Sequence, residues 1–162
     1  MRQASSDDLT EKLGPNHWTI VSRLPSIRER ISEADPEKLR RSTLYVACQG
    51  GEAVGSVVVG TWPPGFWKRS LWEDGKSLGL GVFNLVVHPA KQRQGIGRFL
   101  MEGVERLAQD RGIPCVRLDA YALNPFSTAF YRDVGYTERG VIDVRTVGLI
   151  LFEKRVFNGS GG

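Results

Sequence analysis

The chain has 162 residues, 25% of them charged and 41% hydrophobic, which is typical of a single globular domain, expected here over 1–162. The formal net charge is +4, but no dense run of lysine and arginine is present, so we expect no nucleic-acid partner. No apolar stretch approaches the ~18 residues that span a membrane, and no secretory signal is visible, so we expect a cytoplasmic protein with no membrane partner. Two cysteines and two histidines argue against a zinc site, and we expect no metal.

The first third of the chain predicts helices and then a pair of strands. Ser6-Asp7-Asp8 is a typical helix cap, and residues 18–34 carry apolar side chains at mostly helical spacing. Strands are predicted over 44–49 and 53–61, and the Gly-Gly pair between them favours a hairpin turn.

Residues 62–79 form an unusual connection after the second of these strands. Three of the four tryptophans lie here together with Phe66, and Pro63-Pro64-Gly65 ends the preceding strand. We expect a long loop or a short helix, a kind of segment that is often functional in compact domains.

The segment 81–98 predicts a strand, a turn and the start of a helix. His88-Pro89 stops the apolar strand, and a loop with Gly95 and Gly97 leads to a helix that begins near Arg98. Glycines allow the backbone to approach a ligand closely, and the first N–H groups of a helix have no intrahelical acceptor. The pattern therefore indicates a binding site for an anion such as a phosphate.

The glycine spacing fits neither of two well-known phosphate loops. The dinucleotide fingerprint needs a third glycine where Leu100 stands, and both the spacing and the lysine of the P-loop are missing. A plain turn between a strand and a helix is therefore an open interpretation of Gly95 and Gly97 taken alone.

The rest of the chain predicts one more helix-linked strand and a pair of final strands. The helix after Gly97 leads to a strand over 115–120, a connection that favours parallel neighbours, and the final strands are expected over 136–141 and 146–156. Cys48 and Cys115 both lie in strand-like runs, and we expect two reduced core residues.

Two segments resemble motifs of the GCN5-related N-acetyltransferase (GNAT) family. Gln92-Arg93-Gln94-Gly95-Ile96-Gly97 is similar to its (Q/R)-x-x-G-x-(G/A) loop, and Leu85-Val86-Val87-His88-Pro89 is similar to the strand end before that loop. Residues 124–136 are similar to N-x-x-A-x-x-(F/L)-Y-x-x-x-G-(F/Y), with Ser127 at the usual alanine position. The resemblance covers residues 78–156 well and the start of the chain weakly.

The resemblance implies a fold and a co-substrate. The fold is α/β (α+β), a mixed, mostly antiparallel, twisted sheet of about seven strands flanked by helices, with a splayed pair of parallel strands. The co-substrate is acetyl-CoA, whose pyrophosphate the family binds on the glycine loop and whose pantetheine arm pairs with the strand before it. The residues implied to bind it are Leu85, Val86, Val87, Gln92, Arg93, Gln94, Gly95, Ile96, Gly97, Arg98, Asn124, Phe130 and Tyr131.

The resemblance also implies catalytic roles. Tyr131 stands where the family places a tyrosine beside the sulfur of coenzyme A, and a phenol can protonate a departing thiolate; a core aromatic is the alternative interpretation. Asn124 either binds the pantetheine arm or caps the helix after it.

The base that takes the proton of the amine is less evident. Many family members carry a glutamate on the fourth strand, where this chain has Gly81 or Asn84. Asp119 resembles the placement of the glutamate base in ribosomal-protein N-terminal acetyltransferases, and is our first candidate. A structural carboxylate paired with Arg117 or a loop N–H is its alternative. Other candidates for the base are Glu73, Asp74 and a water held by Asn84.

These inferences predict an acetyl-CoA-dependent N-acetyltransferase that acts by direct attack of a primary amine in a ternary complex. The acceptor is left open between a small molecule and a protein N-terminus. The alternative is a non-catalytic GNAT-like module that binds acyl-CoA or a partner. The 62–79 connection is expected to wall the acceptor pocket, to form a contact in a homodimer, or to pack as a lid on the core of its own domain.

Overall fold

The computed structural model describes residues 2–3 and 42–157 of the chain. The helix cap predicted at Ser6-Asp7-Asp8, the helical segment 18–34 and the tail from residue 158 lie outside the described residues.

The chain forms two compact units. One consists of residues 1–60 and 83–103, and the other consists of residues 61–82 and 104–162. The chain therefore passes between the units three times, and the single domain predicted over the whole length stays a prediction. Two elements contribute to both units: β4 (Gly79–Val87) and α4 (Ile96–Asp110).

The first unit is built on antiparallel strands. The middle strand of the three pairs on one side with the short first strand and on the other with a valine-rich strand that is buried along most of its length. Its own elements are β1 (Arg2–Gln3), β2 (Ser42–Gln49), β3 (Glu52–Gly60) and the 3-10 turn η3 (Pro89–Lys91).

The first turn of α4 packs closely against β3 at Gly55. A Cβ atom at this position would lie 3.0 Å from the Ile96 Cγ2 atom, 3.0 Å from the Val86 carbonyl oxygen and 3.1 Å from the Leu100 Cδ1 atom. The missing side chain lets the strand and the helix approach closely.

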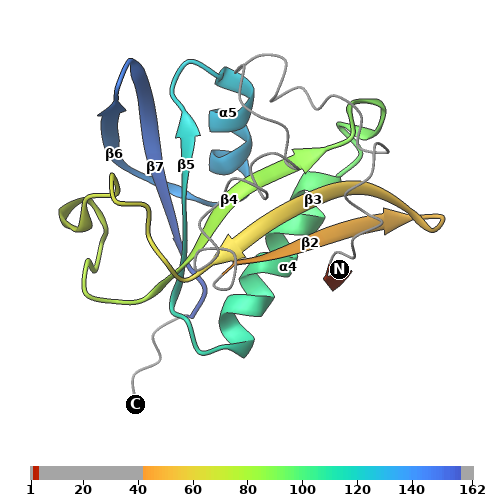
Figure 1. The fold of residues 1–162 in the computed structure, drawn as a ribbon, viewed down its shortest axis with the longest axis horizontal. Coiled ribbons are helices and arrows are strands. Elements are labelled where there is room, and N and C mark those ends of the chain that lie inside the picture. Colours follow the sequence, from red (N-terminus) through yellow and green to blue (C-terminus); the bar gives the residue numbers. More distant parts are fainter. Residues whose placement is uncertain (1, 4–41, 158–162) are drawn as a thin grey trace. The chain divides into compact units, whose positions relative to one another are not determined.

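The second unit combines a parallel strand pair with two antiparallel pairs. The parallel pair joins β4 to the strand after α4, and the antiparallel pairs follow it to the end of the sheet (Figure 1). Its own elements are η2 (Arg69–Leu71), β5 (Cys115–Tyr121), α5 (Pro125–Asp133), β6 (Thr137–Val144) and β7 (Val147–Arg155).

Hydrogen-bonded neighbours follow the order β1-β2-β3-β4-β5-β7-β6. The sheet is therefore open and mixed, with one parallel pair, and the helices α4 and α5 flank it. This confirms the predicted fold class. The register of β4 with β5 runs from Gly79–Cys115 to Val82–Leu118, so Asp119 is the first residue of β5 beyond the last parallel pair.

The strand β5 presents different residues on its two faces because side chains alternate along a strand. Arg117 lies opposite Glu153 of β7 on one face, and Leu118 lies opposite Phe152 on the other. Leu118 and Phe152 are almost fully buried in the core of the unit. Asp119 shares the face of Arg117.

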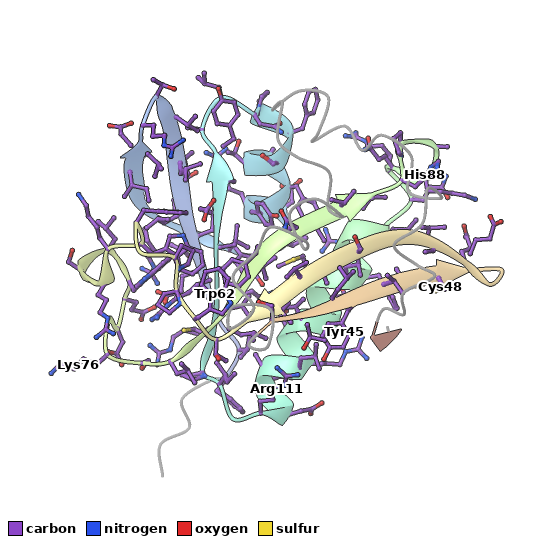
Figure 2. The ribbon with its side chains drawn as sticks, viewed as in Figure 1. Tyr45, Cys48, Trp62, Lys76, His88 and Arg111 are labelled. Carbon is purple, nitrogen blue, oxygen red and sulfur yellow. The ribbon has the colours of Figure 1, made fainter. Side chains whose placement is uncertain are left out.

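Within residues 42–157, the predicted strands and the helix after Gly97 agree with the structure to within a few residues, and two details differ. Helix α4 begins at Ile96, two residues before the predicted start near Arg98, so Gly97 belongs to the helix and not to the loop. Both cysteines are free, as expected, and Cys115 is buried, but the prediction of a core position for Cys48 was wrong: it is exposed at the hairpin end of β2 (Figure 2). A bulge between Ala47 and Cys48 breaks the regular alternation there.

Within residues 2–3 and 42–157, no helix has the length and apolar character needed to cross a bilayer. The cytoplasmic location stays a prediction.

The close contact at Gly55 leads to a stability prediction. We expect Gly55→Ala to lower the free energy of unfolding by about 1 kcal/mol, or the Tm by roughly 2–4 °C, because the new methyl group overpacks the α4 contact. Thermal unfolding followed by circular dichroism measures this. Gly65→Ala is the matched control, since its Cβ has open space; equal Tm values for the two variants would contradict the packing argument.

Candidate active site

The glycine loop before α4 leaves donors for an anion. The first hydrogen bond of the helix runs from the Phe99 N–H to the Gly95 carbonyl oxygen, at 2.9 Å. The N–H groups of Ile96, Gly97 and Arg98 precede it and have no acceptor within the helix. Together with the partial positive charge of the helix start, this arrangement suits a phosphate group, and the predicted phosphate site stays a prediction.

The loop backbone takes a shape that the sequence did not specify. Gly95 has a φ of 83°, in the left-handed region that glycine reaches without strain, but Arg93 also has a positive φ, 64°. The side chains of Arg93 and Arg98 are exposed and can add positive charge to the loop. A non-glycine residue in this conformation is uncommon and is often found at functional sites.

The strand end before this loop is tied to it. The Gln92 side chain donates to the Val87 carbonyl oxygen at 3.5 Å, and His88 accepts from the Ala90 N–H at 3.1 Å, which caps the η3 turn. The His88 N–H donates to the carbonyl oxygen of Val54 in β3 at 2.8 Å. Of the three predicted cofactor-binding strand residues, Val86 is buried, while Leu85 and Val87 are half-buried.

In the second unit, Asn124 starts α5. Its side-chain oxygen accepts from the N–H groups of Phe126 at 3.1 Å and Ser127 at 3.3 Å, which makes it the N-cap of the helix. The predicted capping role is thus seen directly. Binding of the pantetheine arm by Asn124 stays a prediction, and its amide nitrogen is the group left for that role.

Tyr131 lies in the last turns of α5 and is buried. Its ring contacts Phe130, Tyr136 and Phe152, with centroids 5.2, 6.1 and 5.6 Å away. Burial raises the pKa of the Tyr131 hydroxyl well above its usual range, and the charge of Asp119 raises it further. The phenol therefore keeps its proton at neutral pH, as a proton donor must.

Asp119 is held by a residue from the 62–79 connection. The indole Nε1–H of Trp67 donates to its Oδ2 atom at 2.7 Å. Burial raises the pKa of Asp119 above its usual value. The hydrogen bond from Trp67 lowers this pKa and partly offsets the effect of burial. A carboxylate with a raised pKa is a stronger proton acceptor once it is ionised, which suits a general base.

The alternative role of Asp119 is that of a structural carboxylate paired with Arg117 or with a loop N–H. A loop N–H is the partner, and it belongs to an indole side chain. Arg117 instead pairs with Glu153, with its Nε atom 2.6 Å from the Glu153 Oε2 atom, and both side chains are buried.

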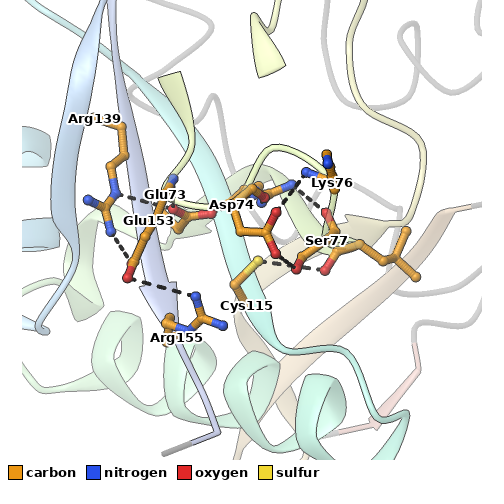
Figure 3. A network of polar contacts seen from close by, with 10 residues as sticks. Glu73, Asp74, Lys76, Ser77, Cys115, Arg139, Glu153 and Arg155 are labelled. Carbon is orange, nitrogen blue, oxygen red and sulfur yellow. Dashed lines mark hydrogen bonds and ion pairs between the residues drawn. The ribbon is translucent and has the colours of Figure 1, made fainter. Parts of the chain in front are cut away.

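This buried pair anchors the 62–79 connection, the yellow-green loop beside β5, β6 and β7 in Figure 1. Arg117 donates to the carbonyl oxygens of Asp74 at 2.7 Å and Ser77 at 3.0 Å. Glu153 accepts from the Glu73 N–H at 2.9 Å and pairs with Arg139 (Figure 3). One arginine and one glutamate of the sheet thus hold the backbone of the loop.

Two of the three tryptophans of the connection are buried in the second unit. Trp67 and Trp72 are 7% and 6% exposed, and their rings meet edge to face with centroids 5.4 Å apart. The Arg117 guanidinium lies 5.0 Å from the centre of the Trp72 ring. These two tryptophans therefore pack as a lid on the core, while Phe66 is 40% exposed.

The other candidates for a base have their own partners. Glu73 forms an ion pair with Arg139 at 2.5 Å, and Asp74 accepts from the Ser77 hydroxyl and from the Lys76 N–H. The Ser77 hydrogen bond, followed by that of Lys76, lowers the pKa of Asp74, which makes it a weaker base. Asn84 is half-buried in β4.

The second unit also holds a buried thiol, that of Cys115. Burial raises the pKa of its thiol to about 11, so it stays protonated at neutral pH and is a poor nucleophile. Within the described ranges, no three histidine, cysteine, aspartate or glutamate side chains gather as a metal site would require.

The roles of Asp119, Tyr131 and the glycine loop stay predictions, while Trp67 and the Arg117–Glu153 pair were not predicted from the sequence. Trp67 is 52 residues away from Asp119 along the chain, and a tryptophan-rich loop does not by itself tell which indole meets which acceptor. Arg117 stands inside the predicted strand 115–120. A charged residue in an apolar strand indicates a buried partner of opposite charge, but it does not tell which residue that partner is.

Comparison with known proteins places the chain in a family. The family model described as the acetyltransferase (GNAT) family matches residues 14–136, more than half of the chain. The chain belongs to the GNAT family. Over 57 residues it is 37% identical to the [ribosomal protein bS18]-alanine N-acetyltransferase of Escherichia coli K12. That match covers 35% of this chain and 38% of the length of its relative.

Solved structures share the GNAT fold. The crystal structure of the ribosomal-protein-S18-alanine N-acetyltransferase from Escherichia coli matches with a TM-score of 0.69 and 18% identity, over 99% of this chain and 96% of that one. A candidate acetyltransferase from Salmonella typhimurium, solved with its cofactor acetyl-CoA, has a TM-score of 0.69 and 18% identity, over 99% and 95%. At these identities the likeness shows the fold.

The anchoring pair leads to a second stability prediction. We expect Glu153→Gln to lower the free energy of unfolding by about 3 kcal/mol, because it leaves the buried Arg117 without a counter-charge. Urea unfolding with an unchanged m-value measures this. The control is Glu138→Gln, which breaks the exposed pair with Arg132 and should change stability by less than about 0.5 kcal/mol. Similar losses in both variants would contradict the anchoring role.

Proposed function

We propose that this GNAT protein is an N-acetyltransferase that transfers the acetyl group of acetyl-CoA to a primary amine. The observation that carries the proposal is the row of N–H donors at Ile96–Arg98, which follows a loop with the family motif. The relatives named as alanine N-acetyltransferases of a ribosomal protein make a protein N-terminus with alanine the first acceptor to test.

The residues present suit coenzyme A. Its diphosphate would accept from the N–H groups at the start of α4, with charge from Arg93 and Arg98. The backbone of Leu85–Val87 and the amide of Asn124 would bind the amide-rich pantetheine arm, and Phe130 would pack against it. When bound, acetyl-CoA supplies an acetyl group activated as a thioester.

Tyr131 serves as the general acid in this proposal. Its buried hydroxyl remains protonated at neutral pH and would give its proton to the thiolate as the carbon–sulfur bond breaks. The proton is replaced from solvent after the product leaves.

Asp119 serves as the general base. Its carboxylate would take one proton from the amine nitrogen as that nitrogen forms the new carbon–nitrogen bond, and would release the proton to water. A direct attack of this kind needs no enzyme nucleophile, in agreement with the protonated state of Cys115.

The acid role is tested by Tyr131→Phe. We expect kcat to fall by about 10²-fold while the Kd of acetyl-CoA stays unchanged, since only the proton donor is removed. Steady-state kinetics and calorimetry measure the two constants. Tyr136→Phe is the matched control, because it removes a hydroxyl from the ring packed against Tyr131. Wild-type turnover in Tyr131→Phe at every pH would rule out the acid role.

The phosphate site is tested by Gly97→Trp. We expect loss of acetyl-CoA binding in calorimetry, because an indole at the second helical position would cover the N–H donors. Gly65→Trp, an identical change at an exposed loop position with open space, should bind normally. Unchanged binding by Gly97→Trp would place the diphosphate elsewhere.

The activity itself is tested by the release of free thiol from acetyl-CoA. The acceptors are a peptide with an N-terminal alanine, an amino acid, a polyamine and an aminoglycoside, each measured against a reaction without amine. Amine-dependent release supports the transferase. Tight acetyl-CoA binding with no release in any reaction would instead indicate the non-catalytic acyl-CoA-binding module.

A further inference from the structure

The 62–79 connection contributes one side chain that the proposed function does not use. The indole of Trp67 is buried, and its N–H group ends on the carboxylate of Asp119 at 2.7 Å. An indole N–H is only a donor, so the contact selects one orientation of the carboxylate and favours its ionised form.

We propose that Trp67 is a positioning residue: it holds the Asp119 carboxylate in the orientation in which its other oxygen accepts the proton of the incoming amine. The proposal rests on the proposed function. It also gives the 62–79 connection a role at the acceptor side, which a simple hydrophobic lid would not have.

The indole is itself held from several sides. Its ring meets Trp72 edge to face, and Trp72 lies under the Arg117 guanidinium at 5.0 Å. Arg117 binds the backbone carbonyls of Asp74 and Ser77 as well as Glu153. A donor on a loop fixed in this way can impose a geometry, which a freely moving loop cannot do.

The loop and Arg117 also limit each other sterically. A Cβ atom at Gly79, where the connection enters β4, would lie 2.6 Å from the Arg117 Cδ atom. Glycine is therefore the residue that lets the Arg117 side chain cross the strand and reach the loop backbone.

Asp119 also lies where a base would have access to a ligand. The last pair between the parallel strands β4 and β5 joins Val82 to Leu118. Asp119 is the next residue of β5, and its described strand partner is Leu151 of β7. Tyr131 packs against Phe152, on the other face of the β5–β7 pair, yet the charge of Asp119 still raises its pKa. Acid and base therefore reach this point of β5 from opposite faces.

The other charged groups on the face of Asp119 are already paired. Arg117 and Glu153 bind each other, and Arg139 joins Glu153 to Glu73 of the loop. Tyr131 is the titratable group that reaches Asp119 from α5, and burial keeps it protonated. Trp67 donates a hydrogen bond to the Asp119 carboxylate, and this bond lowers the pKa of Asp119.

The sign of the expected pH effect follows. The Trp67 hydrogen bond lowers the pKa of Asp119, so Trp67→Phe should let that pKa rise. A base must be ionised to act, so the acidic limb of the pH–rate profile should move upward, by about one pH unit.

The first arm of the test needs no activity. The indole N–H proton resonance of Trp67, assigned by its absence in Trp67→Phe, is followed by NMR between about pH 4 and pH 8. We expect it to shift with a single inflection as Asp119 ionises, and to lose that inflection in Asp119→Asn. A Trp67 resonance that does not respond to pH, or responds equally in Asp119→Asn, overturns the proposal.

The second arm uses acetyl-CoA and the peptide with an N-terminal alanine. We expect Trp67→Phe to lower kcat about 10-fold near neutral pH and to shift the acidic limb upward, with no change in the KM for acetyl-CoA. Trp72→Phe keeps an aromatic ring over Arg117 and retains the Trp67 donor, so its acidic limb should stay at the wild-type pH. In the Asp119→Asn background, Trp67→Phe should have little further effect.

The outcomes separate the two proposals. Absence of thiol release in the wild type, with a titrating Trp67 indole, counts against the proposed function on this peptide and leaves the positioning contact supported. Thiol release with an acidic limb that is equal in the wild type, Trp67→Phe and Trp72→Phe overturns the positioning role alone. Equal shifts in both tryptophan variants also overturn it, since they would indicate a general disturbance of the loop.

Discussion

The buried ion pair between Arg117 and Glu153 is the interaction on which the candidate site of the second unit depends. Two charges removed from water are stable only when their remaining donors and acceptors are used, and here the loop backbone supplies those partners. The pair therefore does more than join β5 to β7. It fixes the long connection that carries Trp67, whose indole N–H donates to Asp119.

Side chains alternate between the two faces of β5, and this alternation links the Arg117–Glu153 pair to Asp119. Arg117 and Asp119 occupy one face, so the residue that anchors the loop and the residue that the loop orients are neighbours on the same strand. The intervening Leu118 faces the core with Phe152, against which Tyr131 packs. In the proposed function, one short strand thus brings together the proposed base, Asp119, held from the loop side, and the proposed acid, Tyr131, held from the helix side.

The fold could be predicted from the sequence because its signals are local, and the motif residues could be named for the same reason, although their roles stay predictions. Strand alternation, the turn before α4 and the cap at Asn124 are each written within a few residues, and the GNAT motifs add the expected roles. Trp67 and Glu153 escaped prediction because their partners are 52 and 36 residues away along the chain. The exposure of Cys48 was missed because a bulge, which interrupts the strand pattern, has no clear sequence sign.

A crystal structure of the protein with coenzyme A tests the central claim most directly. We expect the diphosphate to accept from the N–H groups of Ile96, Gly97 and Arg98, the sulfur to lie beside the Tyr131 hydroxyl, and the Trp67 indole to remain on Asp119. A diphosphate bound away from the start of α4, or a Trp67 side chain turned away from Asp119 in the complex, would contradict this mechanism.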